Sequence, residues 1–176
     1  MKVIVTGAAG FIGSHLSEYL LKEGFEVVGI DNFSEYYSVE VKKDNLQKIR
    51  STAQETSNSF RFVEGSIVND QDLQKLPQDP KYVFHQAGIA GVRYSIDYPV
   101  EYTETNILGT SKLLDYIEET EKFVFASSSS IYGNVPVEDL PVSEDYSDKN
   151  PIAPYPLSKL HCEEMIELYL KLYDIP

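Results

Sequence analysis

Two side chains near the end of the chain combine a phenol with an ammonium group. Tyr155 and Lys159 are four residues apart in a segment, 154–173, whose pattern predicts a helix, so both lie on one helix face. A phenol ordinarily has a pKa of about 10, and a nearby ammonium lowers it by favouring the phenolate. Such a tyrosine can act near neutral pH as a general base on a hydroxyl group. The competing interpretation is a solvated helix face, which the pair alone does not exclude.

Four consecutive serines, 127–130, directly follow a predicted strand at 122–126. Ligands of open parallel sheets lie beyond the carboxyl ends of the strands. If this strand belongs to such a sheet, the serine run brings a hydroxyl group beside Tyr155. The serines and the tyrosine–lysine pair together therefore indicate a site for proton transfer.

A loop with three glycines, spaced GxxGxxG, separates a predicted strand at 2–6 from a predicted helix at 14–23. Gly7 permits a tight turn, Gly10 lets the backbone approach a pyrophosphate, and Gly13 lets the helix pack close to the sheet. The helix N-terminus stabilises the negative charge of such a group. This context predicts dinucleotide binding.

Asp31 follows the second predicted strand, 26–30, and lies 18 residues after Gly13. A carboxylate at this position can accept hydrogen bonds from both hydroxyls of an adenosine ribose and repels a 2′-phosphate, which favours NAD over NADP. The alternative is a structural glycine turn with an unrelated surface aspartate. The order strand, turn, helix, strand, aspartate favours the dinucleotide interpretation.

The remaining pattern alternates strands with helices. Strands are predicted at 2–6, 26–30, 60–63, 81–85 and 122–126, and helices at 14–23, 39–50, 70–76, 99–119 and 154–173. This alternation predicts an α/β fold, a Rossmann-like doubly wound parallel sheet with helices on both faces. We expect one dinucleotide-binding domain over 1–176, which stops at Ile175-Pro176 before a sixth strand and lacks a C-terminal substrate domain.

Composition excludes several other classes of protein. The 28 acidic residues outnumber the 15 basic ones, and the net charge of −13 argues against binding of nucleic acids or anionic membranes. No apolar run approaches the roughly 20 residues that span a bilayer. The single cysteine, Cys162, forms no intrachain disulfide, and the three histidines lack metal-ligand spacing. We expect a cytoplasmic protein without a metal site, and a solvated pair at Glu163 and Glu164.

These motifs together resemble the extended short-chain dehydrogenase/reductase superfamily, and within it the nucleotide-sugar epimerases, from Met1 to Pro176. The segments GVRYS (91–95) and DNFSEYY (31–37) are most similar to UDP-glucuronate 4-epimerases. The resemblance implies NAD as cofactor and a UDP-sugar as substrate, UDP-glucuronate or UDP-glucose/galactose. It also implies a homodimer formed through the two long helices, 99–119 and 154–173.

The resemblance also assigns roles to individual residues. It implies catalytic roles for Ser128, Tyr155 and Lys159, and substrate contacts for Arg93, Ser128, Ser129 and Ser130. Cofactor contacts are implied for Gly7, Gly10, Phe11, Ile12, Gly13, Asp31, Asn32, Ser66, Ile67, Gln86, Ala87, Gly88, Asn106, Tyr155 and Lys159.

The sequence departs from the superfamily pattern at two places. Ser66 follows Gly65 where an aspartate usually meets the adenine, and Pro156 replaces a smaller residue beside Tyr155. Arg93 has two interpretations, because its guanidinium suits a sugar carboxylate or phosphate but can also pin its loop to an acidic neighbour.

Three functions stay open on the sequence. Related dehydratases and decarboxylases carry an acidic residue just after the catalytic serine or threonine, whereas this chain has Ser129 and Ser130. That difference favours oxidation and re-reduction at carbon four alone, which is 4-epimerisation. The alternatives are another nucleotide-sugar-modifying enzyme of the superfamily, and an NAD-binding module that shows no turnover by itself.

Overall fold

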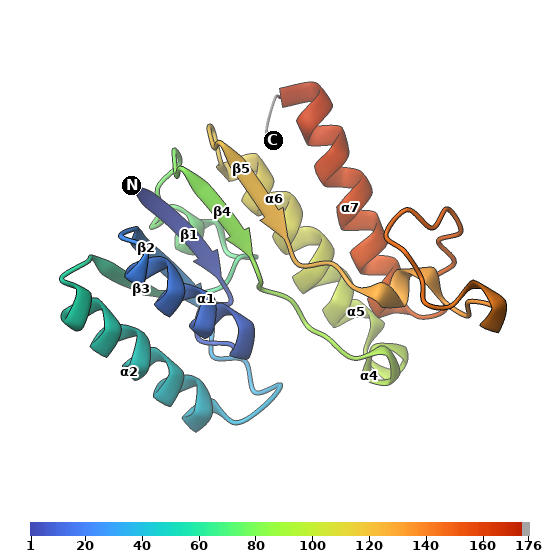
Figure 1. Ribbon diagram of the computed structural model, residues 1–176, viewed down its shortest axis with the longest axis horizontal. Helices are drawn as coiled ribbons and strands as arrows, with labels where there is room; N and C mark the ends of the chain where they lie inside the picture. Colours follow the sequence, from blue (N-terminus) through green and yellow to red (C-terminus); the bar gives the residue numbers. More distant parts are fainter. Residues whose placement is uncertain (174–176) are drawn as a thin grey trace.

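The computed structural model describes residues 1–173 and contains one parallel five-stranded sheet (Figure 1). The strand order is β3-β2-β1-β4-β5, and every neighbouring pair runs parallel. The strands are β1 (Lys2–Thr6), β2 (Glu26–Asp31), β3 (Phe60–Glu64), β4 (Tyr82–His85) and β5 (Lys122–Phe125). The order reverses beside β1, as in doubly wound sheets. The predicted Rossmann-like fold is confirmed.

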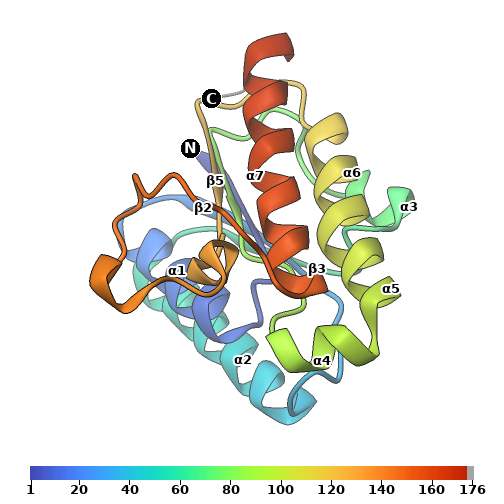
Figure 2. The same cartoon turned by 90° about the vertical axis from the view of Figure 1, so that its right-hand side faces the viewer.

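Helices cover both faces of the sheet (Figure 2). One face carries α1 (Phe11–Lys22) and α2 (Val39–Thr56), which pack against each other. The other face carries α6 (Gly109–Tyr116) and α7 (Pro154–Tyr173). The shorter helices are α3 (Asp70–Leu73), α4 (Val92–Asp97), α5 (Pro99–Tyr102), a π-helical segment (Thr103–Leu108) and two 3₁₀ turns (Ser129–Tyr132 and Val137–Asp139).

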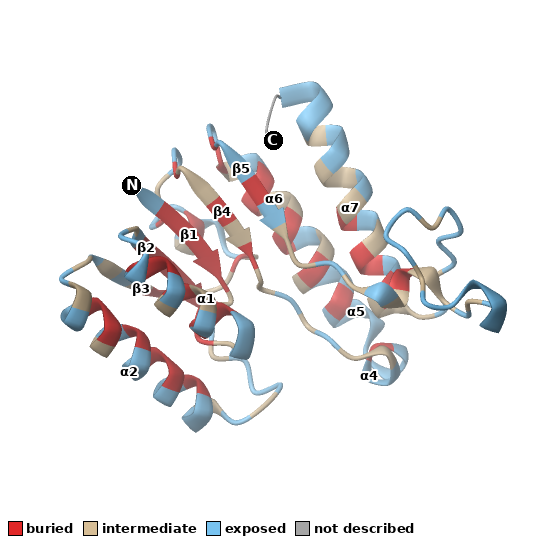
Figure 3. Cartoon of the chain, viewed as in Figure 1, coloured by how far each residue is buried: buried red, intermediate tan, exposed pale blue. Residues whose placement is uncertain are grey.

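Two apolar cores lie on opposite sides of the sheet, because successive side chains of a strand alternate between its faces. Val3 and Val5 belong to the core under α1 and α2, whereas Ile4 belongs to the core under α6. All three are fully buried. Figure 3 shows β1 and the inner faces of the helices as buried, whereas β4 is partly intermediate and β5 partly exposed. Burial on both faces explains why β1 and β2 are nearly continuous apolar runs.

Several predicted helix boundaries were wrong. The first helix begins at Phe11 rather than at residue 14, so Gly13 lies within it. The second continues to Thr56 through a stretch rich in serine and threonine. The predicted helix 99–119 is divided by the π-helical segment and ends at Tyr116, because Ile117 adopts an extended conformation.

The short helix α4, which lies between β4 and α5, was not predicted. The expected start of a sixth strand falls at 174–176, outside the described residues. Within residues 1–173, no helix has the length and apolar character needed to cross a membrane.

Candidate active site

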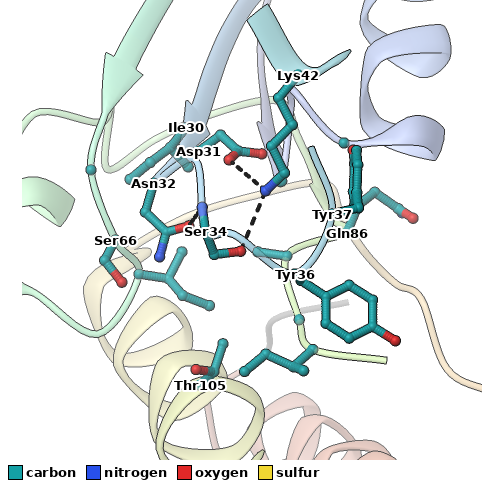
Figure 4. A pocket seen from close by; sticks show the side chains of 17 residues that line it. Ile30, Asp31, Asn32, Ser34, Tyr36, Tyr37, Lys42, Ser66, Gln86 and Thr105 are labelled. Carbon is teal, nitrogen blue, oxygen red and sulfur yellow. Dashed lines mark hydrogen bonds and ion pairs between the residues drawn. The ribbon is translucent and has the colours of Figure 1, made fainter. Parts of the chain in front are cut away.

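A pocket lies at the carboxyl ends of the central strands (Figure 4). It collects residues that follow β1, β2, β3 and β4, as expected for an open parallel sheet. From the predicted cofactor set, the lining includes Gly7, Gly10, Asp31, Asn32, Ser66, Ile67, Gln86, Ala87 and Gly88. Residues from four distant parts of the sequence thus meet in one cavity.

The glycine loop leaves no room for side chains. Gly7 has a φ of +67°, and a Cβ atom there would lie 2.9 Å from the backbone nitrogen of Ala87. A Cβ atom on Gly13 would overlap the carbonyl oxygen of Gly7. These contacts bring the start of α1 close to the ends of β1 and β4, which is the close approach that a pyrophosphate site requires.

The N-terminus of α1 is open to an anion. Gly10 occupies the N-cap position without a side-chain hydrogen bond, and the first turn contains no acidic residue. The side chains of Phe11 and Ile12 are largely exposed, at 73% and 62%, so only the backbone of these residues faces the loop. Free amides and the helix dipole together suit a phosphate group.

Asp31 is buried at the end of β2 and is held by two backbone amides. Its Oδ2 accepts a hydrogen bond from the Ala9 amide at 3.2 Å, and its Oδ1 accepts one from the Phe33 amide at 2.8 Å. Lys42 of α2 places its Nζ 3.4 Å from Oδ1 and 3.4 Å from the Ser34 hydroxyl (Figure 4). A carboxylate acceptor and an ammonium donor side by side suit two adjacent ribose hydroxyls.

The sequence did not predict Lys42, although its side chain is buried. Nothing in the local pattern distinguishes it from the other lysines of a polar helix. Only the packing of α2 against α1 brings it to Asp31.

The turn after β3 closes the far end of the pocket. Gly65 donates to the Asp31 carbonyl at 3.1 Å, and Ser66 donates from its amide to Asp72 Oδ2 at 3.0 Å. Hydrogen bonds from Lys75 and from the Ser66 amide lower the pKa of Asp72. Asp72 therefore holds the turn that places Ser66 and Ile67 at the pocket.

Asn106 lies buried in the π-helical segment, and its side chain connects two other segments by hydrogen bonds. Its Nδ2 donates to the Ile89 carbonyl and to Ser158 Oγ, both at 3.0 Å, and its Oδ1 accepts from the Ile89 amide at 2.8 Å. Ser158 Oγ in turn donates to the Tyr155 carbonyl at 2.7 Å. Asn106 thus joins the loop after β4 to the first turn of α7, and it does not line the pocket.

Lys159 is buried between α7 and the end of β5. Its Nζ donates to the Ala126 carbonyl at 2.7 Å and lies 4.6 Å from the centre of the Phe125 ring. Desolvation lowers the pKa of Lys159 to about 8. Tyr155, one helical turn earlier, is partly buried, and its ring packs edge-on against Tyr102 with the ring centres 6.0 Å apart.

The serine run begins the 3₁₀ turn that packs against α7. Ser128 Oγ lies 2.8 Å from Ser130 Oγ and accepts from the Ser130 amide at 3.2 Å, while Ser129 is exposed. Arg93 is exposed on α4, and no ion pair involves it among the described residues, so the loop-pinning interpretation finds no acidic partner there.

The buried ammonium of Lys159 gives the first testable prediction. A fall in pKa from 10.5 to about 8 means that the charged form costs the fold about 3 kcal/mol. We expect Lys159→Met to stabilise the protein at pH 7 by about 2 kcal/mol, because the lost hydrogen bond to Ala126 offsets about 1 kcal/mol. Urea unfolding at several pH values measures this difference.

The pH dependence of that gain has a defined sign. Below pH 8 the lysine is charged in both states and the penalty is complete. As the pH rises from about 8 towards 10.5, the folded protein releases its proton first and the penalty disappears. A gain for Lys159→Met that is constant between pH 7 and pH 10 would contradict this account.

Glu163 is not a solvated residue, which corrects the expectation for the pair Glu163 and Glu164. One carboxylate oxygen accepts from the Ser127 hydroxyl and the other accepts from Lys149 Nζ at 2.8 Å. This hydrogen bond raises the pKa of Lys149. Glu163 therefore ties the serine run and the long loop after it to α7.

We expect Glu163→Gln to lower the free energy of unfolding by about 1 kcal/mol, since a partly buried ion pair is lost. Glu164→Gln is the matched control, because Glu164 is exposed and forms no ion pair among the described residues. Chemical denaturation of both variants measures the difference. Equal stability of the two variants would show that the bridge contributes nothing.

His85 lies fully buried beneath the site. Its Nδ1 is 2.7 Å from Thr6 Oγ1, and its Nε2 is 2.8 Å from Thr110 Oγ1. Burial, with a smaller effect from the charge of Lys159, lowers the pKa of His85 to about 3. The ring is therefore neutral and joins β1, β4 and α6. In the described part of the chain, no three His, Cys, Asp or Glu residues form a cluster that could hold a metal ion.

The fold and the pocket define a dinucleotide-binding α/β protein. Over residues 3–176 the sequence matches the NAD dependent epimerase/dehydratase family, and the chain belongs to that family.

Curated relatives agree with this assignment. The chain is 36% identical to a UDP-glucuronate 4-epimerase of Thermodesulfobacterium geofontis, an alignment that covers 98% of this chain and 52% of the relative. It is also 36% identical to Protein CapI of Staphylococcus aureus, with 100% and 52% covered. The chain therefore spans about half the length of the curated relatives it matches.

Solved structures show the same similarity. The UDP-glucuronic acid 4-epimerase of Bacillus cereus, in complex with UDP-glucuronic acid and NAD, superposes with a TM-score of 0.88 at 39% identity and covers 100% of this chain and 54% of that one. The UDP-glucose 4-epimerase of Thermus thermophilus, in complex with NAD, gives 0.80 at 33% identity, with 99% and 52% covered. The resemblance inferred from the motifs is confirmed.

Proposed function

We propose that this chain forms the NAD-binding domain, over residues 1–176, of an enzyme that epimerises a UDP-sugar at carbon four. The observation that supports the proposal most is the position of Lys159, whose Nζ would lie 3.4 Å from a Cβ atom on the pocket residue Gly88. Tyr155 lies one helical turn before Lys159, and Ser128 precedes the 3₁₀ turn that packs against α7. The named relatives that act on UDP-glucuronate or UDP-glucose support this choice of reaction.

The pocket residues fit NAD at each of its parts. The glycine loop and the amides of Phe11 and Ile12 receive the pyrophosphate, and Asp31 with Asn32 receives the adenosine ribose. Ser66 and Ile67 border the adenine. Gln86, Ala87 and Gly88 line the pocket after β4, and Gly88 lies close to Lys159 Nζ. When bound, NAD supplies an acceptor for hydride and returns the hydride later.

Proton transfer is the task of Tyr155. Tyr155 takes the proton of the sugar 4-hydroxyl as a general base, while Ser128 donates a hydrogen bond to the same oxygen. The 4-keto sugar then rotates within the site and receives the hydride on its other face, while Tyr155 returns the proton. The product differs from the substrate only in its configuration at carbon four.

The residues after Ser128 favour this reaction over elimination or decarboxylation. Ser129 and Ser130 offer hydroxyls but no carboxylate, so nothing in the serine run removes a proton from a second ring carbon. These hydroxyls and the exposed guanidinium of Arg93 suit the carboxylate or phosphate groups of a UDP-glucuronate.

A homodimer completes the proposal. The outer surface of α7 carries exposed apolar side chains, among them Leu157 at 55% and Leu172 at 61%, and the helix lies beside the segment that contains Leu108 (Figure 2). Two such surfaces can pack as a four-helix bundle.

The function is tested by following UDP-glucuronate and UDP-glucose with the protein and NAD by proton NMR. Inversion at carbon four without loss of water or carbon dioxide supports 4-epimerisation. Formation of a 4-keto-6-deoxy sugar or release of carbon dioxide would instead indicate a dehydratase or a decarboxylase. NAD binding without any turnover would indicate a binding module.

A further inference from the structure

Tyr37 places a buried hydroxyl at the glycine loop without a hydrogen-bond partner. In residues 1–173, its oxygen is the one buried side-chain nitrogen or oxygen atom left unpaired. It lies near the start of α1, since a Cβ atom on Gly10 would be 3.7 Å from it. An unpaired buried hydroxyl destabilises a fold, so its position beside a ligand pocket suggests that a ligand supplies the missing partner.

The surroundings of this hydroxyl show which kind of partner is missing. Burial and the charge of Asp31 raise the pKa of Tyr37, while the backbone amide of Phe11 has a smaller, opposite effect. The phenol therefore keeps its proton at neutral pH, and a backbone amide can only donate to its oxygen, not accept its proton. The proton of Tyr37 therefore lacks an acceptor, at a place where helix amides already favour negative charge.

We propose that Tyr37 donates a hydrogen bond to a phosphate oxygen of the bound dinucleotide. The proposal rests on the proposed function, in which the glycine loop receives the pyrophosphate. It adds a side-chain donor to a site that otherwise consists of backbone amides. Tyr37 also lines the same pocket as Gly7, Gly10 and Asp31.

One contact holds the ring of Tyr37, and a second holds the residue before it. The ammonium of Lys42 lies 5.2 Å from the centre of its ring, and Lys42 is itself paired with Asp31. The neighbouring Tyr36 packs edge-on against Tyr94 of α4, with ring centres 6.1 Å apart. The segment after β2 thus contacts α2 through Lys42 and α4 through Tyr94, which holds the phenol in place before the ligand arrives.

The experiment compares the binding of NAD, ADP-ribose and adenosine to the full chain and to Tyr37→Phe, by titration calorimetry or by NMR titration for adenosine. Tyr37→Phe removes only the hydroxyl. Tyr19→Phe is the control, because Tyr19 lies on α1 with 59% of its surface exposed. We expect about a tenfold weaker affinity of Tyr37→Phe for NAD and ADP-ribose, with less than a twofold change for adenosine, which has no phosphate. Thermal unfolding without ligand should show Tyr37→Phe to be at least as stable as the wild type.

The possible results distinguish failure of the Tyr37 proposal from failure of the proposed function. Unchanged NAD affinity in Tyr37→Phe would overturn the role of Tyr37 and leave the proposed function intact. An equal loss of affinity for adenosine would place the effect at the ribose and overturn the phosphate contact. Absence of NAD binding by the wild-type chain would overturn both proposals.

Discussion

Tyr155→Phe is expected to reduce 4-epimerisation about a thousandfold while changing the affinity for NAD by less than about threefold. The substitution removes the proton acceptor but keeps the ring that packs against Tyr102. Steady-state kinetics with UDP-glucuronate measures the first quantity, and calorimetry measures the second.

The control for this variant is Tyr173→Phe, on the same helix and 63% exposed. It should retain full activity. If Tyr155→Phe retained more than a tenth of the wild-type rate, another group would have to take the proton, and the assignment of Tyr155 as general base would fail.

Gly13→Ala is expected to lower the free energy of unfolding by about 3 kcal/mol and to abolish measurable NAD binding. The new Cβ atom would overlap the Gly7 carbonyl, whose oxygen also accepts from the Gly10 amide at 3.0 Å. The whole glycine loop would have to move away from α1. Urea denaturation and calorimetry test the two effects.

Gly24→Ala serves as the matched control. Gly24 has a φ of +86°, but a Cβ atom there meets nothing within 4 Å. Backbone strain alone should therefore lower the free energy of unfolding of this variant, by about 1 kcal/mol. The variant should bind NAD normally. Equal losses in the two variants would mean that backbone strain, and not steric overlap at the glycine loop, explains the effect.

The central strands β1 and β2 were predictable because burial on both faces leaves a strong apolar signal. All five predicted strands are present, and each boundary agrees within one residue. Helix ends were less predictable. The sequence STAQET at 51–56 has the composition of a loop, but it is helical because Thr52 and Ala53 are buried in the structure. Tertiary packing outweighed the local propensity there.

The residues of the candidate site also fall into a predictable and an unpredictable group. The glycine loop, Asp31 and the pair Tyr155 and Lys159 are recognisable because their chemistry depends on short sequence spacing. Lys42 and Tyr37 were missed, since their contacts with Asp31 and the glycine loop arise from the packing of α2 and of the segment after β2. Glu163 was assigned to the wrong environment because its partner Lys149 lies in a loop without periodicity.

The hydrogen bonds around His85 determine which of its two ring nitrogens carries the proton. The Ala87 amide donates to Thr6 Oγ1, and Thr110 Oγ1 donates to the Asn106 carbonyl. The Thr6 hydroxyl is therefore free to donate to Nδ1, and Nε2 must donate to Thr110. A single imidazole tautomer thus connects β1 to the π-helical turn through a chain in which every donor meets an acceptor. The other tautomer would leave the lone pairs of Nε2 and Thr110 Oγ1 facing each other.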